Sequence, residues 1–206
     1  MNLTARAEIS RAKWLVFLEP GTYTEFFNGT NIPFNCQFIV GEEDDRGVVL
    51  YEVYRVSPSL SLSTYHYGTW TWENGLKLSN LSFYQRRNSL QGLTIDVGYN
   101  SDGSLTLMRK FSNGSSEKDG FIYSVWKTLE GRLNFTTNYS KITTTSWGIL
   151  LNNNTWTGMV SAVMRNEAEV GVGAFGVTAI RSTVVDFFTP ILNTRYFNML
   201  YRKIVF

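Results

Sequence analysis

Cysteine and histidine are almost absent from this sequence, and their scarcity excludes several kinds of site. The 206 residues include one cysteine, Cys36, and one histidine, His66. A lone cysteine forms no disulfide within the chain, and one cysteine with one histidine cannot supply a zinc site. We expect Cys36 to be a buried core thiol, with a disulfide to a segment outside this chain as the alternative. We expect His66 to be structural, and we expect no metal and no cofactor.

Long apolar runs and a surplus of one charge are also missing. No stretch of about 20 apolar residues is present, which is the length that a membrane-spanning helix needs. Met1 precedes polar residues, so the sequence does not open on a signal peptide. The net charge is +2, and no basic stripe occurs. Nucleic acid is therefore not an expected partner.

Seven asparagines begin motifs that are glycosylated in secreted proteins, which suggests the secretory pathway. Candidate N-glycosylation motifs of the form Asn-x-Ser/Thr begin at Asn2, Asn28, Asn80, Asn113, Asn134, Asn138 and Asn153. A chain rich in serine and threonine contains several such motifs by chance, so the excess is modest. Extracellular motifs without a signal peptide predict that the chain is part of a longer protein.

The first part of the chain is predicted to be rich in β-structure. Aromatic and β-branched residues indicate strands at Trp14–Leu18, Phe34–Val40 and Val48–Val56. The acidic segment Gly41–Gly47 is typical of a solvated turn, and residues 68–75 predict another turn. We place a domain boundary near Gln85–Asn88, which gives an amino-terminal region of residues 1–87 and a second domain of residues 88–206.

The second domain alternates strands with helices. The predicted elements are a strand at Leu90–Tyr99, a helix at Phe121–Glu130 ended by Gly131, a strand at Leu133–Tyr139, a helix over 157–166 and a strand at Val170–Ala174. This order indicates an α/β fold with right-handed crossovers. Ligands of such sheets bind beyond the carboxyl ends of the strands.

Residues that suit an anion follow the last of these strands. Thr178 is placed to cap a short helix that carries Arg181. A helix start attracts anions, and a guanidinium binds a carboxylate through two parallel hydrogen bonds. The pattern therefore predicts a carboxylate site, whereas a surface ion pair of Arg181 with Asp186 or Glu169 is the alternative.

The same segment resembles the ligand-binding domain of ionotropic glutamate receptors, and most of all the arthropod receptors used in chemosensation. The matching residues are Trp156, Gly158, Met159, Gly173, Ala174, Thr178, Arg181, Asp186, Phe187 and Pro190. The resemblance implies a clamshell fold like that of periplasmic binding proteins. Residues 88–206 would form most of its first lobe and end before the first pore helix.

The resemblance also implies a ligand site. Arg181 matches the arginine that binds the ligand's α-carboxylate, with Thr178 beside it. Ala174 matches a backbone carbonyl that meets the ligand amine, and Gly176 matches a backbone amide that meets the carboxylate. Trp147 lies near the position of an aromatic lid, although it could instead be a core residue. An acidic group expected near Gly98–Tyr99 is missing, which favours an organic acid other than glutamate.

These features together predict a subunit of a ligand-gated cation channel in the plasma membrane, with this portion extracellular. Its predicted partners are a small organic acid or amino acid and other receptor subunits, in a tetramer that includes a co-receptor. A conventional glutamate-activated receptor and a soluble amino-acid-binding protein are the alternatives. An enzyme is not expected, because no GxxxxGK phosphate loop occurs and a single histidine leaves no nucleophile–histidine–acid set.

Overall fold

The computed structural model describes residues 9–100, 109–110, 116–142, 146–173 and 175–188. The chain divides into two compact units, which are described separately. The first contains residues up to 95 together with 124–138, and the second contains residues 96–123 and those from 139 onward. Both helices and strands occur, and the predicted α/β class is confirmed.

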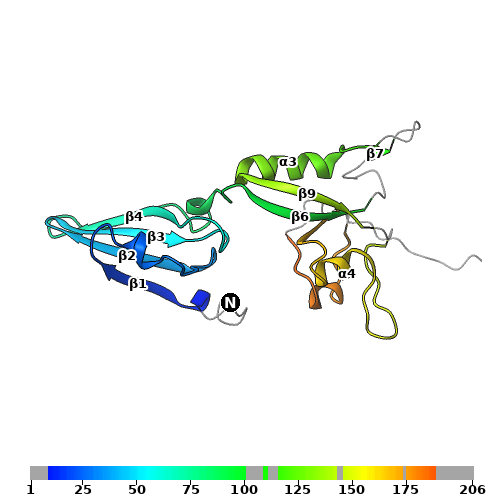
Figure 1. The fold of residues 1–206 in the computed structure, drawn as a ribbon, viewed down its shortest axis with the longest axis horizontal. Coiled ribbons are helices and arrows are strands. Elements are labelled where there is room, and N and C mark those ends of the chain that lie inside the picture. Colours follow the sequence, from blue (N-terminus) through cyan, green and yellow to red (C-terminus); the bar gives the residue numbers. More distant parts are fainter. Residues whose placement is uncertain (1–8, 101–108, 111–115, 143–145, 174, 189–206) are drawn as a thin grey trace, which may run out of the picture. The chain divides into compact units, whose positions relative to one another are not determined.

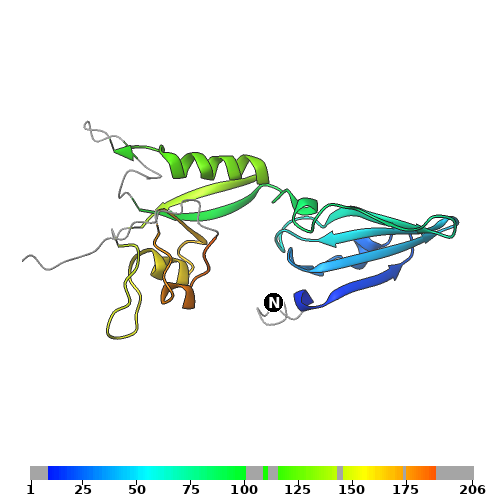
Figure 2. The same ribbon diagram turned by 180° about the vertical axis from the view of Figure 1, so that it is seen from behind.

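A five-stranded sheet forms most of the first unit (Figure 1). Its strands lie in chain order: β1 (Lys13–Leu18), β2 (Gln37–Asp44), β3 (Gly47–Tyr54), β4 (Ser63–Thr71) and β5 (Gly75–Leu78). β1 runs parallel to β2, and each later pair is antiparallel. The short helix α2 (Tyr23–Phe26) lies on one face of the sheet (Figures 1 and 2). The predicted β-rich character of this region is confirmed.

The core of this unit gathers on the face that carries α2. Phe38 and Val40 of β2 pack with Val53 of β3, and the ring of Phe27 meets that of Phe38 edge-on at 5.2 Å. Cys36 is fully buried among them, as expected for a core thiol. Burial raises the pKa of the Cys36 thiol, and the positive charge of Arg87 partly opposes this rise.

Two predicted turns are wrong in extent. β2 continues through the acidic segment to Asp44, and only Asp45 and Arg46 form the turn to β3. The Asp44 carboxylate holds this turn by accepting hydrogen bonds from the backbone N–H groups of Arg46 and Gly47, at 2.8 and 3.0 Å. Residues 68–71 belong to β4, where Val48 pairs with Trp70 across the sheet. Pairing with apolar residues of β3 therefore overrides the local turn signal.

A buried charge cluster holds the segment after β5 against β3. The carboxylate of Glu52 on β3 is fully buried, and it pairs with Arg86 at 2.8 Å and with Arg87 at 3.0 Å. Both arginines belong to the 3-10 helix Gln85–Arg87. Arg87 also donates hydrogen bonds to the backbone carbonyl oxygens of Phe34 and Cys36. The cluster therefore joins parts of the chain that are far apart in sequence.

Aromatic rings surround this cluster. The guanidinium of Arg87 lies 4.0 Å from the ring centre of Phe83 and 4.2 Å from that of Tyr54, and Arg86 lies 4.7 Å from Tyr67. The hydrogen bond to Glu52 raises the pKa of Arg86, whereas burial lowers that of Arg87. Arg87 is the more deeply buried of the two arginines, so its guanidinium loses more hydration.

The second sheet has the strand order β10–β6–β9, from β6 (Leu93–Tyr99), β9 (Phe135–Lys141) and β10 (Val170–Val172). β10 runs parallel to β6, with Val172 opposite Tyr99. β6 and β9 run the same way, because backbone hydrogen bonds join Gly92 to Asn134 at one end and Ile142 to Tyr99 at the other. The carboxyl ends of these three strands therefore meet at one edge. A separate pair, β7 (Arg109–Lys110) and β8 (Ser116–Glu117), is antiparallel.

Two helices accompany this sheet. α3 (Phe121–Leu133) runs beside β9 (Figure 1), where Trp126 contacts Phe135 and donates a hydrogen bond to the Thr137 hydroxyl at 2.8 Å. Gly131 does not end this helix as predicted; α3 continues to Leu133, and Asn134 turns the chain with a φ of 51°.

Helix α4 (Gly158–Met164) packs against β10. Met159 and Val160 are buried, as the helical periodicity predicts, and Ala162 is buried as well. Met164, which the same periodicity places on the apolar face, is 46% exposed and lies outside the core. Among the described residues, no helix combines the length and the apolar content that crossing a membrane requires.

Candidate functional site

The loops beyond the shared strand edge bring an aromatic pair together. Trp147 precedes α4 and Phe175 follows β10, and their rings meet edge-on with 4.7 Å between centres. Gly173 makes this contact possible, because a Cβ atom at this position would lie 2.4 Å from the Trp147 ring. The absence of a side chain at Gly173 therefore sets the position of the indole.

The loop that carries Trp147 is fastened to the first turn of α4. Met159 and Val160 donate backbone hydrogen bonds to the carbonyl oxygens of Ser146 and Trp147, at 3.2 and 3.3 Å. The close approach requires Gly158, which has a φ of 61° and whose added Cβ would lie 2.0 Å from the Ser146 oxygen. Trp147 thus stands on a fixed loop and is half-buried.

Arg181 lies at the start of the 3-10 helix Arg181–Thr183, and its guanidinium joins two loops. One terminal nitrogen, Nη1, donates to the carbonyl oxygen of Gly176 at 2.8 Å, and Nη2 donates to that of Gly148 at 2.9 Å. A guanidinium has five N–H donors. Within the described part of the chain three of them have no acceptor, so the group is held in place and can still bind a carboxylate.

Thr178 and Gly176 complete the surroundings of this cation. The Thr178 hydroxyl oxygen accepts a hydrogen bond from the backbone N–H of Arg181 at 3.3 Å. The N-cap of the 3-10 helix is Ile180, so Thr178 holds the turn before the helix and is not its cap as predicted. Gly176 is exposed, and its backbone N–H donates to no acceptor within the described ranges. That amide and the guanidinium lie on one short segment and are both donors.

The structure brings four of the five predicted ligand-binding residues into one neighbourhood: Arg181, Gly176, Thr178 and Trp147. Ala174 lies outside the described residues. The alternative ion pairs of Arg181 with Asp186 or Glu169 do not occur among the residues that the structure describes. Glu169 instead accepts a hydrogen bond from the backbone N–H of Asp96 at 3.0 Å.

Two contributions to the site were not foreseen from the sequence. Phe175 supports Trp147, and the backbone carbonyl of Gly148 binds Arg181 from 33 residues away. Every residue has a backbone carbonyl, so the sequence cannot show which carbonyl binds Arg181. An aromatic residue between two glycines was the available signal for Phe175.

Adding a methyl group at Gly173 tests how this pair is built. We expect Gly173→Ala to lower the free energy of unfolding by about 1–3 kcal/mol, because the new Cβ overlaps the Trp147 ring. Gly131→Ala is the control, since nothing lies within 4 Å of its added Cβ in α3. In this helix alanine stabilises by about 0.5–1 kcal/mol. Urea unfolding measures both; equal changes would contradict the packing at Gly173.

The candidate glycosylation motifs are distributed over both units. Exposed asparagines of these motifs are Asn28, Asn80, Asn134, Asn138 and Asn153. Asn2 and Asn113 lie outside the described residues. No group of three or more potential metal ligands occurs in the described ranges.

Two family models match the chain, one over each half. The model described as the ligated ion channel L-glutamate- and glycine-binding site matches residues 103–204, which include the Arg181 site. The model described as the ionotropic receptor 75a N-terminal matches residues 11–99. The first of these matches shows that residues 103–204 are similar to a receptor ligand-binding domain.

Curated relatives agree with this class. A glutamate receptor of Lymnaea stagnalis is 26% identical over 94% of this chain and 21% of its own length. A probable glutamate receptor of Anas platyrhynchos is 33% identical over 38% of this chain and 16% of its own length. Residues 103–204 are therefore similar to the ligand-binding segment of ionotropic glutamate receptors. The chain spans about a fifth of the length of these relatives.

Solved structures show a weaker likeness. A Mnemiopsis leidyi ionotropic glutamate receptor ligand-binding domain in complex with glycine is 18% identical, with a TM-score of 0.40, over 46% of this chain and 39% of that chain. The AvGluR1 ligand-binding domain in complex with methionine is 19% identical, with a TM-score of 0.37, over 48% and 37%. The likeness to ionotropic glutamate receptors rests on the sequence matches.

Proposed function

We propose that this chain is part of a ligand-gated cation channel subunit of the arthropod chemosensory type, with this portion outside the plasma membrane. The main support for this proposal is the position of the Arg181 guanidinium. Two backbone carbonyls hold it near the strand edge, and three of its N–H donors remain without an acceptor within the described residues. The match of residues 11–99 to the ionotropic receptor 75a N-terminal model supports the chemosensory branch.

The proposed ligand is a small organic acid. Its carboxylate binds the free donors of Arg181 and the backbone N–H of Gly176, and the ring of Trp147 lies over its apolar part. Ala174 is assigned the carbonyl that meets an amine when one is present, and Thr178 supports the turn. Gly176 supplies an amide without a hydroxyl, and no acid stands at Gly98–Tyr99. This chemistry favours an acid with a single carboxylate over glutamate.

In the proposed mechanism, residues 88–206 are the first lobe of a clamshell and residues 1–87 are a partial amino-terminal region. A second lobe and the pore helices belong to segments outside this chain, and four subunits, including a co-receptor, form the channel. Ligand bound between the lobes opens the channel only through its greater affinity for the closed clamshell. A carboxylate that bridges Arg181 to the second lobe provides that difference.

Currents from the full-length subunit, expressed with its co-receptor, test this proposal. We expect short organic acids to evoke cation currents, while amines of the same chain length evoke none, because the site offers hydrogen-bond donors and a positive charge. Glutamate tests the alternative of a conventional receptor, and a response to glutamate alone would favour it.

The remaining alternatives have their own measurements. A soluble amino-acid-binding protein would have a second lobe and no pore helices in the sequence that follows residue 206. An enzyme would show turnover of an amide or an ester. His66 is exposed on β4, and its ring lies edge-on to that of Tyr51 with 6.0 Å between centres.

A further inference from the structure

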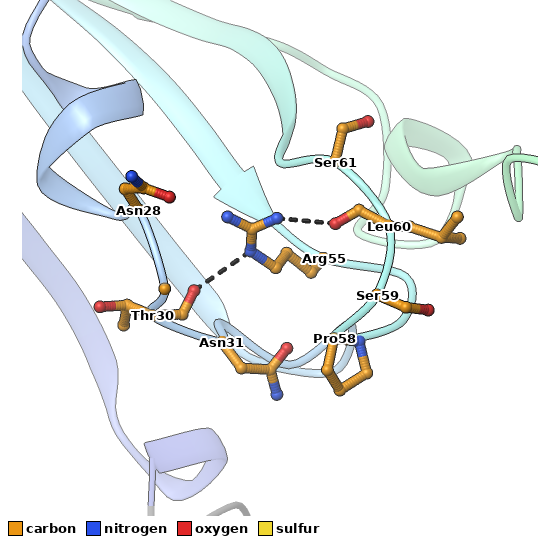
Figure 3. A pocket seen from close by; sticks show the side chains of 9 residues that line it. Asn28, Thr30, Asn31, Arg55, Pro58, Ser59, Leu60 and Ser61 are labelled. Atoms are coloured by element: carbon orange, nitrogen blue, oxygen red, sulfur yellow. Dashed lines mark hydrogen bonds between the residues drawn. The ribbon is translucent and has the colours of Figure 1, made fainter.

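A polar hollow of about 400 Å³ lies in the first unit (Figure 3). Its walls are the turn that follows α2, residues 28–31, and the loop that follows β3, residues 58–61, with Arg55 between them. This volume falls within the range of about 300–1,000 Å³ that is typical of small-molecule sites. Its lining residues include two asparagines and three residues with hydroxyl groups: Asn28, Asn31, Thr30, Ser59 and Ser61.

Arg55 builds the hollow and is committed to its walls. The guanidinium donates to the carbonyl oxygens of Thr30 at 3.1 Å, Leu60 at 2.6 Å and Phe27 at 3.2 Å. Figure 3 shows it between the two loops, with the bonds to Thr30 and Leu60 drawn. The guanidinium of Arg55 fixes both loops through these three carbonyls. Because its charge is already solvated by them, the hollow suits a neutral polar ligand.

Asn31 lines this hollow and carries an unpaired acceptor. The residue is only 8% exposed, and its side-chain oxygen Oδ1 is buried without a hydrogen-bond partner among the described residues. Figure 3 shows the Asn31 side chain beside Pro58. A buried acceptor left unpaired lowers stability, because it has lost its hydrogen bond to water. A ligand that donates an N–H or O–H group would remove this cost.

Asn28 stands at the rim of the same hollow and begins the motif Asn28–Gly29–Thr30. Its side chain is exposed, so a sugar attached there starts next to the site. The other described motif asparagines do not line this hollow. A tethered sugar has an effective concentration in the millimolar range, so weak contacts are enough to seat it.

We propose that Asn28 carries an N-glycan whose first N-acetylglucosamine occupies the hollow and donates a hydrogen bond to Oδ1 of Asn31. Attachment transfers the sugar from a lipid-linked pyrophosphate donor: the C1–Nδ2 bond forms, the C1–O bond to pyrophosphate breaks, and the amide loses one proton. The ring of Pro58 offers the sugar an apolar contact. The inference rests on the extracellular location in the proposed function.

Native deglycosylation of the full-length subunit, made in eukaryotic secretory cells, tests the proposal. Peptide-N-glycosidase cleaves the bond between asparagine and the first sugar, and mass spectrometry of glycopeptides follows each site. We expect release from Asn28 to be at least tenfold slower than from Asn80 and Asn153, with all sites released after denaturation. Asn31→Ala should abolish this protection. Asn88→Ala, at an exposed asparagine outside the hollow, should preserve it.

A second measurement applies if Asn31→Ala fails to fold. Asn28→Gln should lower the melting temperature by about 4 °C, whereas Asn80→Gln should leave it unchanged. Equal rates of sugar release from Asn28, Asn80 and Asn153 would overturn the docking of the sugar but not the proposed function. An Asn28 without a sugar, in a subunit whose other motifs carry sugars, would do the same. A subunit without sugar at any motif would overturn the extracellular placement and the docking with it.

Discussion

Glu52→Gln is expected to lower the free energy of unfolding of the first unit by about 3–5 kcal/mol. Both side chains that pair with Glu52 are arginines, and the side chains of Glu52 and Arg87 have no solvent exposure. Removing the carboxylate leaves two positive charges next to each other in a buried site. Their hydrogen bonds to backbone carbonyls cannot replace the lost counter-charge, because a carbonyl is neutral.

Glu43→Gln is the matched control for this prediction. Glu43 lies on the adjacent strand β2 and is exposed, so its loss should change stability by no more than about 0.5 kcal/mol. Urea unfolding of both variants, followed by tryptophan fluorescence, provides the comparison. If the two variants unfold at the same urea concentration, the cluster does not stabilise the unit.

The second large effect is expected at Arg181. In the full-length subunit, Arg181→Ala should raise the acid concentration for a half-maximal current at least thirtyfold, which corresponds to about 2 kcal/mol or more of binding energy. The alanine removes the charge that faces the ligand. It also removes the link between Gly176 and Gly148, so the loops around Trp147 lose a shared support.

Two further variants separate charge from geometry. Arg181→Lys keeps the charge, but a single ammonium cannot span both carbonyls and a carboxylate, so we expect an intermediate loss. Arg165→Ala should have no effect, since Arg165 is an exposed residue that pairs with Glu167 at 2.8 Å. Surface expression is measured for every variant. Acid currents that persist unchanged in Arg181→Ala would refute the proposed role.

Local patterns allowed much of the fold to be predicted. The helical spacing of Met159 and Val160 and the β-branched content of β3 are each a pattern within a single helix or strand. Such a pattern indicates which side chains are buried without knowledge of distant residues. The neighbourhood of Arg181 could be predicted for the same reason. Thr178, Gly176 and Arg181 lie within six residues of one another, and their hydrogen bonds are local.

Features that depend on distant partners could not be predicted. Glu52 and Arg86 are 34 residues apart, and nothing near either residue indicates that both are buried. The adjacent arginines at 86 and 87 instead look like a polar boundary in the sequence. The strand at Ser63–Thr71 was missed because its glycine and polar residues resemble a turn until β3 lies beside them. The hollow near Asn31 likewise exists only after two loops meet.

The acceptors that hold Arg181 are main-chain carbonyls, and this has an evolutionary consequence. Substitutions elsewhere in the loops replace side chains without deleting those oxygens. Trp147 and Phe175 could therefore be replaced during gene duplication and divergence, while the guanidinium of Arg181 keeps its position. Under the proposed function, changes in the aromatic pair would alter which ligand shapes fit, while Arg181 would keep its position for binding a carboxylate.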